Sequence, residues 1–279
     1  MSSTKRRKFM SLVLNTNLVS LNTQRNINNN QSATATAMQR LSSGLRINSA
    51  KDDAAGLAIG SKMDSQIRGL NVAIRNANDG TSLLQTADGT LGTMSDIFQR
   101  MRELSVQAAN GSYGTTDYTQ LDKEYQSLAT EATRIATDTK FNGLDILKGK
   151  AGAFVFQIGA DVGQTLTVTT TDATTYLALP GDLTDATNAN TAIGALDTAL
   201  ASLNTDRSNY GAGLSRLDFT AQNLRTSVEN QTASRSRIMD ADYAQESANL
   251  AKQQVLQQAG IAMLAQANQQ PQQILSLLR

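Results

Sequence analysis

Hydrophobic residues recur at steps of three and four near the start of the chain. They fall in two groups, at Leu14, Leu18 and Leu21 and at Met38, Leu41 and Leu45. Residues 26–37, which lie between the groups, read NINNNQSATATA and are polar and poor in helix formers. The spacing predicts a helix, but one that is marginal by itself and depends on a partner for its stability.

A second and much longer hydrophobic repeat follows. Apolar residues alternate by four and three from Met63 to Ala108, and the alternation slips once, at Leu84. Because one omitted residue in a heptad pattern overwinds a supercoil locally without ending it, we predict one helix over residues 49–109, about 90 Å long. A shorter repeat over residues 121–135 predicts a further helix that is joined to the first by a short loop.

The pattern then changes to period two, which is typical of strands. Asn142–Gly143 is a hairpin-type turn, and alternating hydrophobic residues at 154–158 and 166–168 flank a second, glycine-containing turn. These residues predict a small β-hairpin element. Residues 169–190 are rich in Thr, Asp, Ala and Gly and contain Pro180, so we expect an exposed surface segment there.

The most regular repeat covers residues 196–228 and is expected to pair with the helix of residues 49–109. Beyond Ser236 the composition shifts to alanine and glutamine. Small residues then share one face, at Ala244, Ala248, Ala251, Val255, Ala259 and Ala262. Small side chains let helices approach closely, and repeated glutamines make another face that is wettable without strong adhesion. Pro271 is expected to interrupt this helix before the apolar end.

Together these elements predict a mainly α fold. We expect long antiparallel helices in a coiled-coil-like bundle with a small β-hairpin element, and N- and C-terminal segments that pack together. Each end is a marginal helix of about forty residues without an obvious core of its own. The ends either fold when they meet copies of themselves or form one intramolecular hairpin, and the pattern favours the two readings equally.

Residues 41–59, LSSGLRINSAKDDAAGLAI, form a joint between two predicted helices. Gly44 can take the left-handed conformation that ends the first helix. Ser49 begins an S-x-x-D capping pattern with Asp52, and Asp53 follows near the positive N-terminus of the next helix. The sequence alone also fits an ordinary helix–loop–helix with solvated charges.

Basic side chains crowd the carboxylates of this joint, at Arg40, Arg46 and Lys51. Charge-assisted hydrogen bonds between them could hold the joint at a defined angle instead of leaving a flexible linker. The residues that we expect to form the joint are therefore Arg46, Ser49, Asp52 and Asp53.

Composition narrows the function classes. The formal net charge of +1 gives no electrostatic support for binding nucleic acid or an anionic membrane. The chain has no cysteine and no histidine, which removes the commonest metal ligands, Ser–His–Asp and Cys–His nucleophiles and H-E-x-x-H peptidases. Aromatics are only 4%, whereas compact enzymes usually have bulky aromatic centres. We expect no enzyme activity and no cofactor.

Residues 1–9 form a basic extension with Lys5, Arg6, Arg7 and Lys8. It is either an anion-binding arm, a disordered tail, or the product of a misplaced start codon with Met10 as the true initiator. The disordered tail and the misplaced start are the readings that we favour.

Several ordered strings resemble bacterial flagellin. They are VLNTN at 13–17, LSSGLRINSAKDDAAGLAI at 41–59, RNANDGTSLLQTADG at 75–89, QRMRELSVQAAN at 99–110, TKFNG at 139–143 and ANQQPQQILSLLR at 267–279. They cover both ends and most of the interior of the chain. The resemblance implies a structural subunit that self-assembles into the flagellar filament for swimming motility and is exported unfolded through the flagellar secretion channel.

The resemblance also implies a domain plan. Residues 10–48 and 237–279 would form an inner helical domain, and 49–168 and 191–236 an outer helical domain with the β element. Residues 169–190 would be a short variable surface segment where larger family members insert whole domains. The C-terminal helix would line the filament channel, with channel-lining or assembly residues at Gln253, Gln254, Gln257, Gln258, Leu264, Leu275 and Leu278.

Partners and location follow from the same resemblance. The implied partners are copies of the chain, an export chaperone, hook-associated and cap proteins and a flagellin-sensing Toll-like receptor, in an extracellular filament. Receptor contact would map by motif to Arg100, Leu104 and Glu124, with charged groups around an apolar side chain. The strings depart from the usual ones at Met101 and Ser105.

Two other functions compete with the filament subunit. A cell-surface flagellin homologue could bind polysaccharide or a receptor, but its surface segment holds one aromatic residue, Tyr176. A hook–filament junction protein is a close cousin, against which the terminal string ANQQPQQILSLLR favours the filament subunit.

Overall fold

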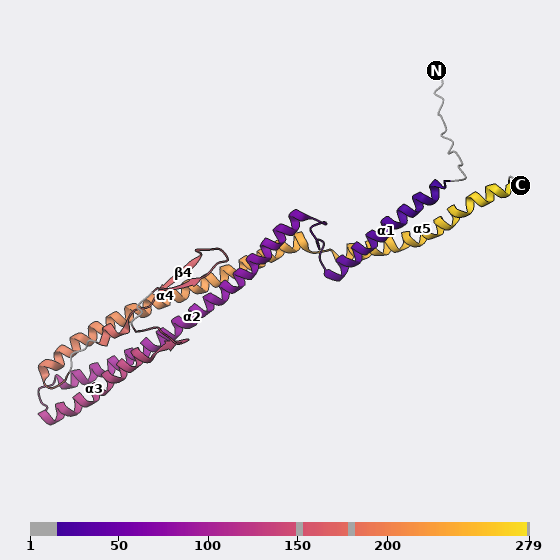
Figure 1. The fold of residues 1–279 in the computed structure, drawn as a ribbon. Coiled ribbons are helices and arrows are strands. Elements are labelled where there is room, and N and C mark those ends of the chain that lie inside the picture. Colours follow the sequence, from indigo (N-terminus) through magenta and orange to yellow (C-terminus); the bar gives the residue numbers. More distant parts are fainter. Residues whose placement is uncertain (1–15, 149–152, 178–181, 278–279) are drawn as a thin grey trace, which may run out of the picture. The chain divides into compact units, whose positions relative to one another are not determined.

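The computed structural model describes residues 16–148, 153–177 and 182–277, and within them the chain is mainly helical (Figure 1). The helices are α1 (Leu18–Ser43), α2 (Ala54–Ala108), α3 (Thr115–Asp138), α4 (Ala186–Met239) and α5 (Tyr243–Leu277), with a 3₁₀ turn, η1, at Ala173–Leu177. The strands are β1 (Lys140–Phe141), β2 (Leu144–Asp145), β3 (Ala153–Gln157) and β4 (Thr165–Thr169). This confirms the predicted mainly α fold with a small β element.

The chain divides into two compact units. Unit 1 comprises the described residues of Met1–Met63 and Ala233–Arg279, and unit 2 comprises those of Asp64–Thr232. The boundaries therefore fall inside α2 and α4, and each unit is described by itself.

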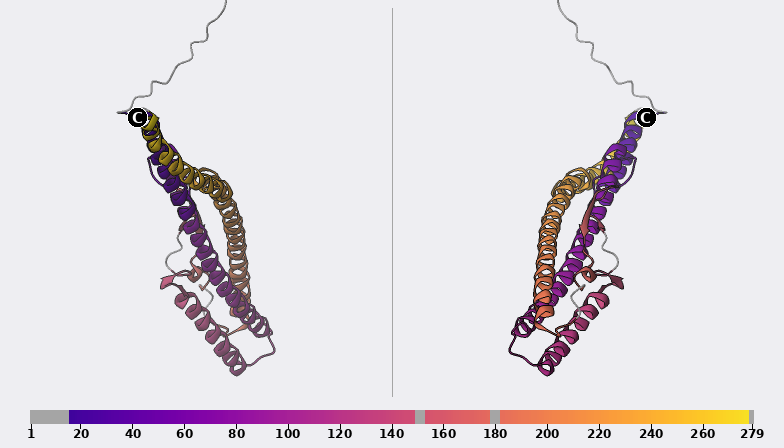
Figure 2. Two further views of the ribbon diagram at one scale, coloured as in Figure 1. Left: turned by 90° about the vertical axis from the view of Figure 1, so that its right-hand side faces the viewer. Right: turned by 90° about the vertical axis from the view of Figure 1, so that its left-hand side faces the viewer.

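In unit 2, α2 and α4 run antiparallel. Arg102 Nε donates to Asp197 Oδ1 at 2.6 Å, and farther back along α2 the Asp88 carboxylate accepts from Arg207 Nε at 2.9 Å. A Cβ on Gly213 of α4 would lie 3.0 Å from Leu84, so the two helices approach closely there. The pairing predicted from the two hydrophobic repeats is confirmed, and α3 lies beside α2 (Figure 2).

The hydrophobic core belongs to unit 2. Both clusters of buried apolar side chains in the described part of the chain lie between Leu70 and Val228. The largest fully buried members include Phe98, Met94, Met101, Tyr125, Tyr210, Leu196 and Ile146. They come mostly from the four-three repeats of α2 and α4 and from the shorter repeat of α3, so heptad spacing becomes the seam between these helices.

Two hairpins form the β element. Asn142 and Gly143 join β1 to β2 with φ values of 49° and 79°, as a type I′ turn requires. β3 and β4 pair antiparallel, with Phe156 opposite Leu166. Both predicted turns are confirmed.

The prediction that residues 169–190 form an exposed segment is wrong. Among the described residues of this stretch, Thr170, Ala173, Tyr176, Leu183 and Ala189 are buried. Thr170, Ala173 and Tyr176 are spaced by three, but this run is confined to the short 3₁₀ turn η1 and the residues just before it and is too brief to predict burial from the pattern. Because the ring of Tyr176 is buried, the one aromatic side chain proposed for carbohydrate binding is not available at the surface.

Polar contacts attach this segment to the helices around it. Thr171 Oγ1 donates to the buried Asp206 at 2.7 Å, and the backbone N–H of Thr171 donates to the hydroxyl of Tyr210 at 3.1 Å. Farther along, the N–H of Leu183 donates to Asp122 Oδ1 at 2.8 Å. The segment is therefore part of the folded unit 2, and not a loop outside it.

Unit 1 is an antiparallel pair of helices, α1 and α5, with little core. A Cβ on Gly260 of α5 would lie 3.0 Å from Ile27 of α1, and the helices pack along their length. In the described part of this unit, the buried apolar side chains are those of Ala37, Ile47, Met239 and Ala267. The predicted packing of the terminal segments against each other is confirmed.

The expected interruption at Pro271 is wrong, because α5 continues through it to Leu277. A proline inside a helix removes one backbone donor, and the side chain of Asn17, the N-cap of α1, supplies a replacement.

Candidate functional site

The joint predicted at residues 41–59 lies within unit 1. Gly44 has a φ of 71°, and its N–H donates to the carbonyl of Arg40 at 2.8 Å, which ends α1 in the predicted left-handed cap. Two backbone bonds then attach this stretch to the end of α4. The N–H of Arg46 donates to the carbonyl of Met239 at 2.7 Å, and the N–H of Ala241 donates to the carbonyl of Gly44 at 2.9 Å.

The cap of α2 differs from the prediction. The helix begins at Ala54, not near Ser49, and Asp53 Oδ1 accepts the N–H of Gly56 at 2.9 Å. Asp52 instead closes the preceding turn: its Oδ2 accepts from the N–H and hydroxyl of Ser49 and from the N–H of Asn48. These bonds hold the pKa of Asp52 below its usual range.

The basic side chains do not pair with Asp52 and Asp53 as expected. Arg46 Nη2 donates to the carbonyl of Ile238 at 2.6 Å, and Arg40 Nη1 lies 2.9 Å from Glu246 Oε1 of α5. Local N–H groups already occupy the two aspartates, so the arginines act between the N- and C-terminal halves of unit 1 instead.

Close packing also holds the joint. The side chain of Ile47 is 2% exposed, and a Cβ on Gly60 would lie 2.5 Å from the sulfur of Met239. The joint is thus a packed junction and not a solvated linker. Each single hydrogen bond in it contributes only about 1 kcal/mol to stability.

The ion pair of Glu246 is expected to make the stability of the α1–α5 pair sensitive to acid. Hydrogen bonds from Asn249 and then Arg40 hold the pKa of this buried carboxyl below its usual value. The stabilisation is present above the unfolded pKa of about 4.3 and is lost as pH falls through the lower folded pKa. We expect Glu246→Gln to lower stability by roughly 1–2 kcal/mol at pH 7 and to flatten the loss of helicity between pH 5 and 3, followed by circular dichroism. An equal loss of helicity on acidification in the original chain and in Glu246→Gln would contradict this role of Glu246.

The glutamines of α5 do not share one face. Gln253, Gln257 and Leu264 are half-buried, at the helical spacing of Gly260, which faces α1, whereas Gln254 and Gln258 are exposed. Adjacent positions on a helix point about 100° apart, so neighbouring glutamines separate. Of the described residues on the predicted channel face, only Gln254 and Gln258, the second glutamine of each pair, are exposed in the single chain. Leu278 and the side chain of Leu275 lie outside the described residues, as does the basic extension of residues 1–9.

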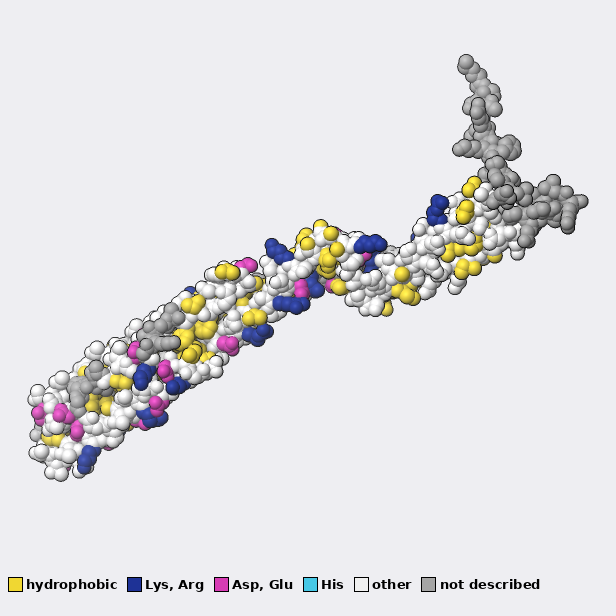
Figure 3. Space-filling view, viewed as in Figure 1, with side chains coloured by type: hydrophobic (Ala, Val, Ile, Leu, Met, Phe, Trp, Pro, Cys, Tyr) yellow, Lys and Arg dark blue, Asp and Glu magenta, His cyan; other side chains and the backbone are white. Residues whose placement is uncertain are grey.

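The small-residue face of α5 has no partner within the described chain. All six residues predicted to share it, Ala244, Ala248, Ala251, Val255, Ala259 and Ala262, are exposed. Larger apolar side chains are exposed beside them, among them Ile261 at 56% and Met263 at 61%. On α1, Leu18 and Leu21 are more than half exposed, and apolar side chains show at the surface of unit 1 in Figure 3. Such a surface is typical of an interface between molecules.

The predicted receptor residues divide between surface and core. Arg100 and Glu124 are exposed, and Arg100 Nη2 donates to Glu124 Oε1 at 2.8 Å, while Arg100 Nη1 donates to Glu103. Leu104, however, is 1% exposed, so the prediction of an apolar contact there is wrong for its side chain. Recognition through Arg100 and Glu124 stays a prediction, which the loss of a receptor-reporter response to monomer with Arg100→Ala would test.

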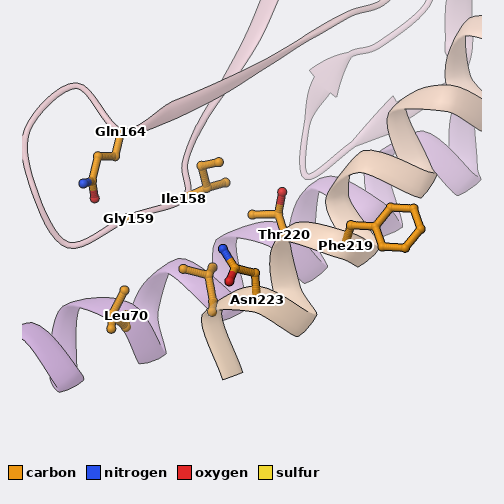
Figure 4. Close-up of a pocket in the computed structure, with 8 residues that line it drawn as sticks. Leu70, Ile158, Gly159, Gln164, Phe219, Thr220 and Asn223 are labelled. Atoms are coloured by element: carbon orange, nitrogen blue, oxygen red, sulfur yellow. The ribbon is translucent and has the colours of Figure 1, made fainter. Parts of the chain in front are cut away.

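One open pocket lies in unit 2, where the β3–β4 turn meets α2 and α4 (Figure 4). It is lined by Leu70, Ile158, Gly159, Gln164, Phe219, Thr220, Asn223 and Leu224. None of these lining side chains is charged, so the pocket offers neither an acid–base pair nor a cation site.

Two kinds of feature are absent from the part of the chain that the structure describes. No group of three or more acidic side chains there is placed to hold a metal ion. No described helix is both long and apolar enough to cross a membrane.

Family comparisons match both ends of the chain. Residues 14–151 match the bacterial flagellin N-terminal helical region, and residues 193–278 match the bacterial flagellin C-terminal helical region. A flagellin of Halalkalibacterium halodurans is 45% identical over 272 residues, which cover 96% of this chain and 100% of that protein. The flagellar filament 33 kDa core protein of Treponema phagedenis is 41% identical over 286 residues, covering 96% and 100%.

A solved structure agrees with these relatives. The crystal structure of Bacillus cereus flagellin matches with a TM-score of 0.51 and 39% sequence identity, covering 54% of this chain and 88% of that one. The helices that the two family regions span are those that form units 1 and 2. The chain belongs to the bacterial flagellin family.

Proposed function

We propose that this chain is the structural subunit of a bacterial flagellar filament and that it polymerises through unit 1. The observation that carries the proposal is the exposed small-residue face of α5, which has no partner within the described chain. Contacts of one copy with the next through two different surfaces generate a helical polymer when the rotation between copies does not close a ring.

The uneven distribution of core supports the same conclusion. Unit 2 contains the buried apolar clusters, whereas unit 1 buries few apolar side chains and leaves many exposed. An isolated pair of helices with so little buried area is marginally stable. Order in unit 1 is therefore gained when neighbouring copies cover its exposed faces.

Finer features of the proposal rest on the family. The subunit acts outside the cell, in the filament, after export in an unfolded state. A chaperone that covers the apolar C-terminal end before export is consistent with the exposed apolar side chains of α5. Capture of the chaperone by the full chain, compared with a chain that ends at residue 239, tests this partner.

Enlarging the small-residue face tests the polymerisation surface. Ala251→Gln with Ala259→Gln keeps a good helix former at exposed positions, so the monomer should melt within about 2 °C of the original. Longer side chains prevent close approach of a neighbouring helix, and we expect growth from filament seeds to slow at least tenfold, measured by light scattering.

The matched control carries the same change at exposed alanines of unit 2, Ala201→Gln with Ala212→Gln. It should grow within about threefold of the original chain. Unchanged growth of the α5 variant, or equal slowing of both variants, would remove the evidence for this surface.

We also propose that the joint transmits assembly at unit 1 to unit 2. Arg46 and Asp53 hold its backbone, so Arg46→Met or Asp53→Ala should alter growth rate or filament curvature in electron micrographs. Each loss amounts to about 1 kcal/mol, so the melting temperature of the monomer should change little. Lys51→Met is the control, because Lys51 is exposed beside the same turn. A large drop in melting temperature with normal filaments would make the joint an ordinary helix cap.

A further inference from the structure

The helix α5 contains a proline in its interior, and this leaves one carbonyl without its helical donor. Pro271 has no N–H, so the carbonyl of Ala267, four residues earlier, receives no bond from the α5 backbone. Ala267 is 4% exposed, and a buried carbonyl without a donor is costly.

Asn17 supplies the missing donor from the other end of the chain. Its Nδ2 donates to the carbonyl of Ala267 at 2.7 Å. Its Oδ1 accepts the N–H of Ser20 at 3.1 Å and so caps the N-terminus of α1. One amide side chain therefore satisfies a free donor at the start of α1 and a free acceptor inside α5 at the same time.

A second polar contact lies directly beside the first. Ser20, which is 8% exposed, donates its hydroxyl to Asn268 Oδ1 at 2.8 Å. These contacts are directional, as is the Arg40–Glu246 ion pair farther along the two helices, whereas the half-buried positions of α5 between them include Gln253, Gln257 and Gly260 at repeated spacing. A seam of that kind distinguishes poorly between registers that differ by one helical turn.

Only one register satisfies Asn17. If α5 slipped by one turn, the amide of Asn17 would face a carbonyl near Met263 or Pro271, where the helix has its own N–H donors at Ala267 and Leu275. The carbonyl of Ala267 would then be buried without a donor. Pro271 thus leaves one carbonyl of α5 without a backbone donor, and Asn17 donates to that carbonyl only in the native register.

We propose that Asn17 and Pro271 form a register key for the α1–α5 pair. The pair positions the small-residue face of α5 relative to the exposed apolar side chains of α1, so its importance for assembly rests on the proposed function. Asn17 is a positioning residue, because it would act on assembly through its contact with α5. The key explains why a helix-breaking residue is tolerated inside α5.

A double-mutant cycle tests the key. Asn17→Asp keeps an N-cap but places a carboxylate oxygen against the Ala267 carbonyl, whereas Pro271→Ala returns an N–H to α5. Register is read by disulfide trapping, because the chain has no cysteine of its own. Ile27→Cys with Gly260→Cys reports the native register, since those positions touch, and Ile27→Cys with Leu264→Cys reports a slip of one turn.

We expect Asn17→Asp to lower the ratio of native to slipped crosslinks about tenfold, and to lower it less than threefold when Pro271→Ala is also present. Rescue by Pro271→Ala is a result that a merely structural cap would not give, because the cap itself does not involve α5. An equal loss in both backgrounds, or no loss, overturns the key.

Crosslinks are measured in the full chain both as monomer and after seeded polymerisation. Coupling between the two positions without any polymer growth would support the key and contradict the proposed function. Polymer growth without coupling between the two positions would support the proposed function and contradict the key. Absence of the native crosslink in both samples would also overturn the key, because the α1–α5 pair would then not form in this register.

Discussion

Replacing Phe98 by alanine is expected to lower the free energy of unfolding of unit 2 by about 3–5 kcal/mol. The ring is fully buried in α2, where it contributes to the large hydrophobic cluster shared with α3 and α4. Removing it loses apolar burial and leaves a cavity that long, rigid helices cannot easily close. The melting temperature measured by circular dichroism should fall by on the order of 10 °C.

Phe219→Ala is the matched control. That ring belongs to α4 and is 71% exposed, so the same change should alter unfolding by no more than about 0.5 kcal/mol. A loss below 1 kcal/mol for Phe98→Ala, or equal losses for both variants, would mean that unit 2 does not depend on this core.

The sequence predicted the helices well because a heptad repeat encodes both an element and its buried face. The four-three repeats at 63–108 and 196–228 became α2 and α4, and their apolar positions became the seam of unit 2. Asn142–Gly143 was equally informative, since few dipeptides accept two positive φ values.

The errors arose where local signals overlap and where contacts distant in sequence decide the structure. Two capping patterns overlap at the start of α2, and local rules did not distinguish Ser49 from Asp53 as the cap. The interruption expected at Pro271 ignored a donor on Asn17, 250 residues away in the chain. Arg46 donates to the backbone carbonyl of Ile238 and not to the carboxylates close to it in sequence.

The prediction of an exposed segment after β4 failed for another reason. The buried residues of this segment keep a spacing of three only around the short turn that contains Ala173, and the Thr and Asp side chains between the buried positions resemble a loop. Burial there depends on partners in α3 and α4, which local composition does not encode.

Removing residues 240–279 is expected to abolish filament growth while leaving unit 2 folded. The deletion takes away α5 and with it the partner of α1, the small-residue face and the Glu246 ion pair. The buried clusters all lie before residue 229, so they are left intact. The truncated chain should therefore keep the melting transition of unit 2, and its loss of helicity should correspond to unit 1.

Electron microscopy of seeded growth measures this most directly. Short filament fragments are mixed with purified full chain or with the chain that ends at residue 239, and filament length is followed over time. The full chain should extend the seeds, and the truncated chain should leave them at their starting length although its melting curve shows folded unit 2. Filaments that lengthen equally with the truncated chain would contradict polymerisation through unit 1.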